Sequence, residues 1–308
     1  MKVNRKIAAL VSLVFCFVLS NGCREEKIVL QKVDNKFGSK LFAVSRIPTP
    51  VLNTQYFDSI YGGKDGRTLK KSSSGLVKEL EYVAYPGTSF EILNIINKGN
   101  HSIYRVYAED YSIPELKIEL YIDSRFTDTT RIKPSPRKVD LPSKSEIINY
   151  MKTNTGSLYV WGGNNVEGVP EMFEFYPPSG KLDEKERKEW GLKGVDCSGL
   201  IYQATNGFTP RNTHQMVTYG EAVEIEGLSS DEIAKKLLPL DLIVWKGHVI
   251  IVIDNGITIQ SAHSSWGVVQ KGLKEVLKSL MAKRTALNAW NDDESKKFVI
   301  RRWYKEKN

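Results

Sequence analysis

Cysteine and histidine are scarce in this chain: its 308 residues include three cysteines and four histidines. None of them has the spacing of a zinc site. The sequence also lacks a low-complexity tract and the aromatic and basic strand signature of a nucleic-acid-binding module. We therefore expect a globular protein that holds no metal, needs no cofactor and binds no nucleic acid.

Long hydrophobic runs are missing as well. The longest apolar stretch near the start, Ile7–Leu19, is too short to span a bilayer comfortably and follows a basic segment. A basic start, a short apolar run and small residues are typical of an export signal. Cys23 then resembles the lipidated cysteine of a bacterial lipobox, although the leucine lies one place early. We predict a signal over residues 1–23 and a lipid anchor at Cys23; the alternative is an ordinary signal containing a cysteine.

One thiol remains after processing. Cys16 leaves with the signal and Cys23 is acylated, so Cys197 stays unpaired. Exported proteins usually pair their cysteines or lack them. We therefore expect Cys197 to be reactive, the alternative being an inert buried cysteine. The net charge of +8 suits anionic surroundings such as a wall polymer or a membrane face.

Residues 24–130 have the pattern of a β module with an irregular N-terminal extension. Short apolar runs separated by tight turns predict strands, and their close spacing predicts a small β-barrel or sandwich. No acid, base or metal cluster stands out in it, so we expect a binding or positioning role. The predicted strands are Leu80–Tyr85, Phe90–Ile96, Ile103–Tyr107 and Leu116–Ile122.

A proline-rich basic segment, residues 131–142, is typical of an extended linker. Ser143 with Glu146 three residues later is a capping box, so a helix begins there. We place the start of a second domain at this helix and extend it over residues 143–308.

The surroundings of Cys197 indicate a nucleophile. The residues after it predict a helix that Asn206-Gly207 ends, and Asp196 is a preferred N-cap residue. Cys197 then lies in the first turn, where exposed peptide N–H groups lower a cysteine pKa and stabilise an oxyanion.

His248 is the candidate base. It begins an apolar strand in a predicted antiparallel meander, and a Cys on a helix facing a His on a strand is the papain-like arrangement. A third polar group should orient the imidazole. A three-residue loop at Asp254-Asn255-Gly256 places Gln260 opposite Ile250 and within reach of His248, whereas a two-residue loop brings His263 opposite it. We favour Gln260.

With these motifs in place, residues 143–302 resemble the NlpC-type cell-wall cysteine peptidases. The β module similarly resembles the bacterial SH3-like domains that often precede them. The segments that carry the resemblance occur in the family's order: Tyr159-Val160-Trp161-Gly162-Gly163, Asp196-Cys197-Ser198-Gly199-Leu200, Pro210-Arg211-Asn212-Thr213-His214-Gln215, Leu240-Asp241-Leu242-Ile243 and Gly247-His248-Val249.

The resemblance implies an α+β fold: a papain-like catalytic domain after an all-β SH3-like barrel. It implies that Cys197 attacks an amide carbonyl, that His248 moves the proton, and that Tyr159 polarises the carbonyl. Asp196 and Ser198 match positions that help to bind the amino end of a peptidoglycan stem peptide. The implied cut lies between γ-D-glutamate and the following diamino acid.

The chain departs from the family pattern in three places. Gln260 stands where most members have histidine, and Ile250 where a small residue is usual. The segment Asn164–Gly194 is longer than usual, either as a lid or groove wall that narrows substrate choice or as a surface excursion of no consequence. Arg211 and His214 fall in a predicted loop, Arg211 pinning it and His214 on the surface.

The sequence therefore predicts an exported, membrane-anchored, monomeric cysteine peptidase of the cell envelope. Its expected partners are stem peptides or muropeptides, together with the membrane through the lipid anchor. Two other readings stay open: an amidase or acyltransferase on the same scaffold, and a non-catalytic wall-binding lipoprotein.

Overall fold

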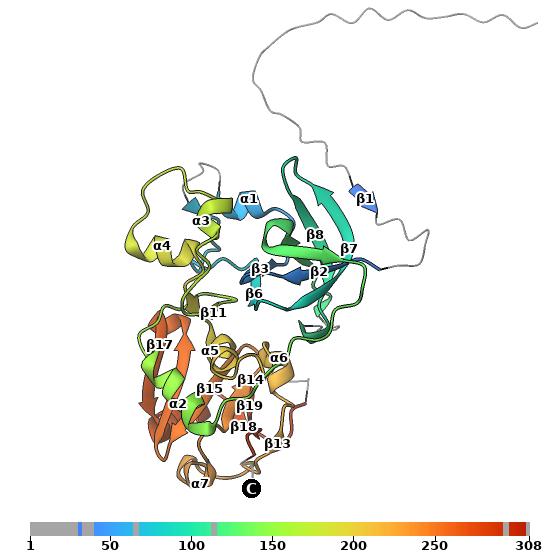
Figure 1. Ribbon diagram of the computed structural model, residues 1–308. Coiled ribbons are helices and arrows are strands. Elements are labelled where there is room, and N and C mark those ends of the chain that lie inside the picture. The colour runs from blue at the N-terminus through green and yellow to red at the C-terminus, as the bar shows by residue number, and fades with distance from the viewer. Residues whose placement is uncertain (1–29, 33–39, 64–67, 112–115, 292–295, 306–308) are drawn as a thin grey trace, which may run out of the picture.

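Two large sheets organise the chain (Figure 1). The computed structural model describes residues 30–32, 40–63, 68–111, 116–291 and 296–305. The predicted signal and Cys23 lie outside the described residues. Within the part that is described, no helix is long and apolar enough to cross a membrane.

The first sheet is antiparallel throughout and lies in the N-terminal part of the chain. Its eight strands follow the order β10-β2-β7-β8-β9-β3-β6, with β1 paired to β7. It agrees with the predicted β module, whose SH3-like identity stays a prediction. The strands are β1 (Leu30–Lys32), β2 (Phe42–Ser45), β3 (Thr49–Leu52), β6 (Leu80–Ala84), β7 (Ser89–Asn97), β8 (Ser102–Tyr107), β9 (Leu120–Asp123) and β10 (Thr127–Thr130).

One predicted strand begins later than expected. The run Leu116–Ile122 forms a strand only from Leu120, because Lys117 has a positive φ of 47° and turns the chain. A left-handed backbone cannot continue a strand. Short elements join the strands of this half: α1 (Phe57–Ile60), β4 (Tyr61–Gly62), β5 (Thr68–Leu69) and two 3-10 turns at Glu109–Tyr111 and Ser124–Phe126.

The second sheet follows the order β13-β19-β14-β15-β16-β17, with β18 parallel to β19. The predicted antiparallel meander is confirmed in β14, β15 and β16. The strands are β13 (Glu221–Ala222), β14 (Leu242–Trp245), β15 (His248–Asp254), β16 (Ile257–Ala262), β17 (Gly267–Gly272), β18 (Thr285–Ala286) and β19 (Lys297–Arg302).

Helices cover both faces of this sheet. Helices α2 and α5 pack on the face that carries Val249 and Ile251, while α7 and α8 pack on the face that carries Ile250 and Val252. Burial on both faces explains why β15 is a continuous apolar run instead of an alternating one. The helices are α2 (Lys144–Thr153), α5 (Cys197–Ala204), α6 (Thr213–Met216), α7 (Ser230–Lys236) and α8 (Leu273–Met281).

The predicted caps of α2 are confirmed. The Ser143 hydroxyl accepts from the Glu146 N–H, and the Glu146 carboxylate accepts from the Ser143 N–H.

The segment before α2, residues 131–142, contains no helix or strand, as expected of a linker. Its Arg137 side chain makes two contacts. Its guanidinium donates to the Asn206 carbonyl at 2.6 Å and lies over the Tyr85 ring. Residues 131–142 therefore contact both halves of the chain.

Candidate active site

Asp196 and Gly199 set the position of Cys197. The Asp196 carboxylate accepts from the Gly199 N–H at 2.6 Å and caps α5, which places the buried Cys197 at the first helical residue, as predicted. A Cβ atom on Gly199 would lie 1.9 Å from the Gly163 carbonyl oxygen. The helix start can therefore approach the Trp161-Gly162-Gly163 loop only because position 199 is glycine.

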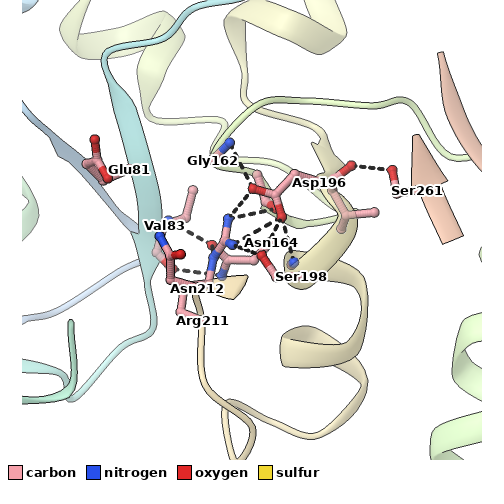
Figure 2. A network of polar contacts seen from close by, with 12 residues as sticks. Glu81, Val83, Gly162, Asn164, Asp196, Ser198, Arg211, Asn212 and Ser261 are labelled. Atoms are coloured by element: carbon pink, nitrogen blue, oxygen red, sulfur yellow. Dashed lines mark hydrogen bonds and ion pairs between the residues drawn. The ribbon is translucent and has the colours of Figure 1, made fainter. Parts of the chain in front are cut away.

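A buried ion pair joins Arg211 to Asp196, the residue before the cysteine (Figure 2). Arg211 donates to both carboxylate oxygens of Asp196, at 2.8 and 3.1 Å, and to the Ser198 hydroxyl at 2.9 Å. The Gly162 N–H donates to the same carboxylate at 3.1 Å. Asp196 and Ser198 are thus fully engaged inside the protein. Arg211 pins its segment as expected, since only 4% of it is exposed.

Further hydrogen bonds tie this network to both sheets. The Asn164 side chain donates to the Val83 carbonyl and accepts from the Val83 N–H, so that it pairs with β6 as a strand residue would. The Ser261 hydroxyl donates to the Val195 carbonyl at 2.7 Å, which fixes the residue before Asp196 against β16 (Figure 2). The position of Cys197 is therefore set jointly by the two halves of the chain.

His248 begins β15 and is oriented by Gln260 on β16. The Nε2 atom of His248 lies 2.6 Å from the amide oxygen of Gln260. Since that oxygen only accepts, Nε2 carries the proton and Nδ1 keeps its lone pair. The Trp245 ring packs at 5.2 Å from the imidazole ring.

The hairpin register favours Gln260, but through a different turn from the one predicted. Asp254 pairs with Ile257, so the turn contains only Asn255 and Gly256. A register shift between Val252 and Asp254 then restores the pairing of Ile251 with Ile259, which brings Gln260 beside His248. His263 instead packs against the Tyr159 and Trp266 rings.

The pKa of the Cys197 thiol differs from the one that the sequence predicts. Burial raises the pKa of Cys197 to about 12, and the charge of Asp196 adds to this. Hydrogen bonds from the N–H groups of Val249 and Ser198 act the other way but are outweighed. The expected lowering of the cysteine pKa is therefore wrong for the free protein, because the first turn of α5 is buried.

Cys197 and His248 are consequently both neutral near pH 7. Burial lowers the pKa of His248, against the raising effect of its bond to Gln260. The N–H of Val249 lies against the Cys197 sulfur, and Val249 directly follows His248. Cys197 and His248 therefore lie in the same region of the structure. No hydrogen bond joins them within the described residues.

A cavity of about 200 Å³ opens at Cys197 between the two halves of the chain. Tyr159 lines it, and burial raises the pKa of its hydroxyl, which therefore stays protonated and able to donate. His214 lines the same cavity and is half-buried; it lies in the short helix α6 and not in the predicted loop. The lining comprises Glu81, Tyr111, Leu116, Ile118, Tyr159, Trp161, Gly162, Asp196, Cys197, Ser198, Arg211, Asn212, Thr213, His214 and Gly247.

Glu81 and Tyr111 are the polar residues that the β module contributes to the cavity, and the sequence did not reveal them. The Tyr111 hydroxyl donates to one Glu81 oxygen at 2.8 Å, and the Asn53 amide donates to the other at 2.8 Å. Glu81 forms no ion pair with any described residue. Unlike Asp196, it offers the cavity an uncompensated negative charge. No local sequence pattern identifies Glu81 as a site residue, because only the packing of the two sheets brings it near Cys197.

The long segment 164–194 fastens the two halves together. It contains β11 (Asn164–Asn165), α3 (Met172–Phe175), α4 (Glu184–Trp190) and β12 (Gly194–Val195). Met172 and Trp190 are buried in one core with Phe57 and Ile60 of α1. The Tyr176 hydroxyl donates to the buried Asp123 of β9 at 2.5 Å. The segment is therefore packed into a core and is not a surface excursion, while its effect on substrate choice as a lid or groove wall stays a prediction.

Among the described residues, no group of three or more His, Cys, Asp or Glu side chains could hold a metal ion. A scan of protein-family models and a search of curated proteins both find no match.

The chain is similar to solved NlpC/P60 structures. An NlpC/P60 family protein from Bacillus cereus matches over 86% of this chain and 64% of its own, with 17% identity and a TM-score of 0.33. The peptidoglycan hydrolase RipB from Mycobacterium tuberculosis matches over 53% and 65%, with 18% identity and a TM-score of 0.32. NlpC1 from Trichomonas vaginalis matches over 87% and 94%, with 13% identity and a TM-score of 0.36.

This chain spans less than two thirds of the first two proteins.

Proposed function

We propose that this chain is a cysteine peptidase that hydrolyses the amide between γ-D-glutamate and the following diamino acid in peptidoglycan stem peptides. The observation that carries the proposal is the position of Cys197 at the start of α5, against the Val249 N–H, beside a His248 that Gln260 orients. A helix-borne thiol beside an oriented imidazole is a nucleophile with its base.

The reaction begins with proton transfer from Cys197 to His248 Nδ1 while the sulfur attacks the carbonyl carbon. The resulting oxyanion is stabilised by N–H groups in the first turn of α5 and by the Tyr159 hydroxyl. The C–N bond then breaks as His248 returns the proton to the leaving amine, which leaves a thioester. Water, deprotonated by His248, attacks the thioester and releases the acid and the free thiol.

Glu81 supports recognition of the amino end of the substrate. Its carboxylate lines the cavity without a cationic partner among the described residues, and the Tyr111 hydroxyl holds it in place. An α-ammonium group in this cavity would gain a charge-assisted hydrogen bond. Asp196 and Ser198 act instead by holding the wall of the cavity, because Arg211 already neutralises Asp196.

The proposal includes the location: with an export signal and a lipidated Cys23, the protein is anchored to a membrane of the cell envelope. A monomer suffices, because one chain supplies all of the proposed catalytic residues.

The test is incubation of the mature protein with L-Ala-γ-D-Glu-diaminopimelate peptides and product identification by mass spectrometry. Cleavage after γ-D-Glu that is lost in Cys197→Ala supports the peptidase. Binding without turnover would favour a wall-binding protein, and a product joined to a new acceptor would favour a transferase. Peptides with free and acetylated alanine test recognition of the amine.

A further inference from the structure

His263 follows β16 directly and takes no part in the proposed proton transfers. It begins the 3-10 turn His263–Ser265, which joins β16 to β17. Its ring centroid lies 5.7 Å from that of Tyr159 and 4.5 Å from that of Trp266. The Nε2 atom of His263 is buried and has no hydrogen-bond partner among the residues that the structure describes. The position of the ring therefore depends on packing and not on a hydrogen bond to Nε2.

Trp266 ends this turn in a left-handed conformation, with a φ of 52° and a ψ of 23°. A bulky residue rarely adopts this backbone, and such residues persist where the surrounding structure holds them, often at functional sites. Two backbone hydrogen bonds of 3.0 Å hold Trp266. Its N–H donates to the His263 carbonyl, and its carbonyl accepts from the Tyr159 N–H. The turn is therefore joined to Tyr159 by the backbone as well as by ring packing.

The contacts continue from Trp266 to the segment 164–194. The Lys185 ammonium of α4 lies 4.1 Å from the centroid of the Trp266 ring. Lys185, Trp266, His263 and Tyr159 thus form a continuous row of side chains that begins in this segment. Of these four, only Tyr159 lines the Cys197 cavity.

We propose that His263 is a positioning residue, which holds the Tyr159 ring so that its hydroxyl donates to the oxyanion formed at the scissile carbonyl. This inference rests on the proposed peptidase activity. The described residues form no hydrogen bond with the Tyr159 hydroxyl, so its direction is set by how the ring packs. A donor that is already in place stabilises developing charge without having to reorganise.

The test is a double-mutant cycle on the L-Ala-γ-D-Glu-diaminopimelate peptide. Tyr159→Phe removes the donor and should lower kcat about 100-fold. His263→Ala leaves the donor but frees its ring, and should lower kcat roughly 10-fold with little change in KM. Tyr159→Phe/His263→Ala should be no slower than Tyr159→Phe alone, because the group that His263 positions is already absent.

The matched control is His263→Phe, which keeps a planar ring and removes both ring nitrogens. Since packing is the proposed role, this variant should retain most of the wild-type kcat. Losses in the double variant that multiply those of the two single variants would show a general structural effect and overturn the inference. An equal loss in His263→Phe and His263→Ala would also overturn it, because the ring would then not be what matters.

A second measurement needs no turnover. If the wild-type protein does not cleave the peptide, the proposed activity fails, while the order of the Tyr159 ring can still be measured by carbon-13 relaxation in the free protein. Lower order in His263→Ala, with wild-type order in His263→Phe, supports the positioning role. Unchanged order of the Tyr159 ring in His263→Ala refutes it.

Discussion

The amide oxygen of Gln260 lies 2.6 Å from His248 Nε2, on the strand next to the one that His248 begins. A carboxylate at this position would stabilise the imidazolium by charge. A neutral amide instead fixes the tautomer and the ring orientation. The pair therefore favours a neutral imidazole whose lone pair is on Nδ1.

Replacing Gln260 with alanine should lower kcat with little change in KM, because the imidazole loses its orientation while the peptide cavity is kept. Loss of one hydrogen bond to a group that becomes charged during reaction predicts a decrease of about 10-fold to 100-fold. Steady-state kinetics on the tripeptide measure it. Gln260→Glu is the matched variant and should retain more activity; equal activity of Gln260→Ala and wild type would remove Gln260 from the mechanism.

The ionisation of Cys197 gives a second prediction. With a pKa near 12, the thiol is protonated at neutral pH, so its alkylation by iodoacetamide should be slow at pH 7 and rise about tenfold per pH unit above it. Mass spectrometry of the peptide that contains Cys197 measures the rate separately from the other cysteines. A plateau beginning below pH 7 would show a thiolate–imidazolium pair instead.

The sequence contains enough information for the local elements of the site. Asp196 before an apolar helix predicts the cap, and the capped helix predicts the first-turn position of Cys197. These signals are local and each depends on a few adjacent residues. The register of the hairpin after His248 is harder to predict from the sequence. The partner of His248 depends on an extra residue in β15, which strand propensity does not reveal.

Long-range packing explains what the sequence could not predict. Glu81 reaches the cavity only because Asn164 pairs with Val83 two residues along β6. The raised pKa of Cys197 depends on how deeply α5 is buried, which no motif encodes. In the same way, the sequence shows Trp190 only as a hydrophobic residue after a charged run. Its burial in the core around Phe57 follows from the tertiary structure.

Glu81 should determine binding of the substrate's amino end. Glu81→Gln keeps the shape of the side chain and removes the charge, so KM for a peptide with a free alanine amine should rise about tenfold. The acetylated peptide, which has no ammonium group, should show the same kinetics with both proteins. If the two peptides responded equally to Glu81→Gln, the carboxylate would have a structural role.

Arg211 should be essential for stability. Removing its guanidinium leaves the buried Asp196 carboxylate without a cationic partner, and Arg211→Met should lower the free energy of unfolding by about 3 to 5 kcal/mol. Urea denaturation of the folded variant measures the change. The double variant Asp196→Asn/Arg211→Met removes both charges and should recover a large part of the loss. A single variant within about 1 kcal/mol of wild type would contradict the network.

Gly199 is the residue whose replacement should separate α5 from the loop that precedes it. A Cβ atom there meets the Gly163 carbonyl oxygen at 1.9 Å, a backbone atom that cannot rotate away. Gly199→Ala should therefore destabilise the protein by about 1 to 3 kcal/mol through overpacking. It should also lower kcat, because the first turn of α5 moves with the helix. Urea denaturation and steady-state kinetics measure the two effects.

Gly272→Ala is the matched control for this substitution. Its Cβ would meet only the Glu275 Cβ, at 3.9 Å, and its backbone φ of −62° is one that alanine adopts freely. We expect this variant to unfold and to turn over substrate like wild type. Equal behaviour of the two alanine variants would mean that the helix start tolerates a shift, and that the close approach of α5 to Gly163 is not what positions Cys197.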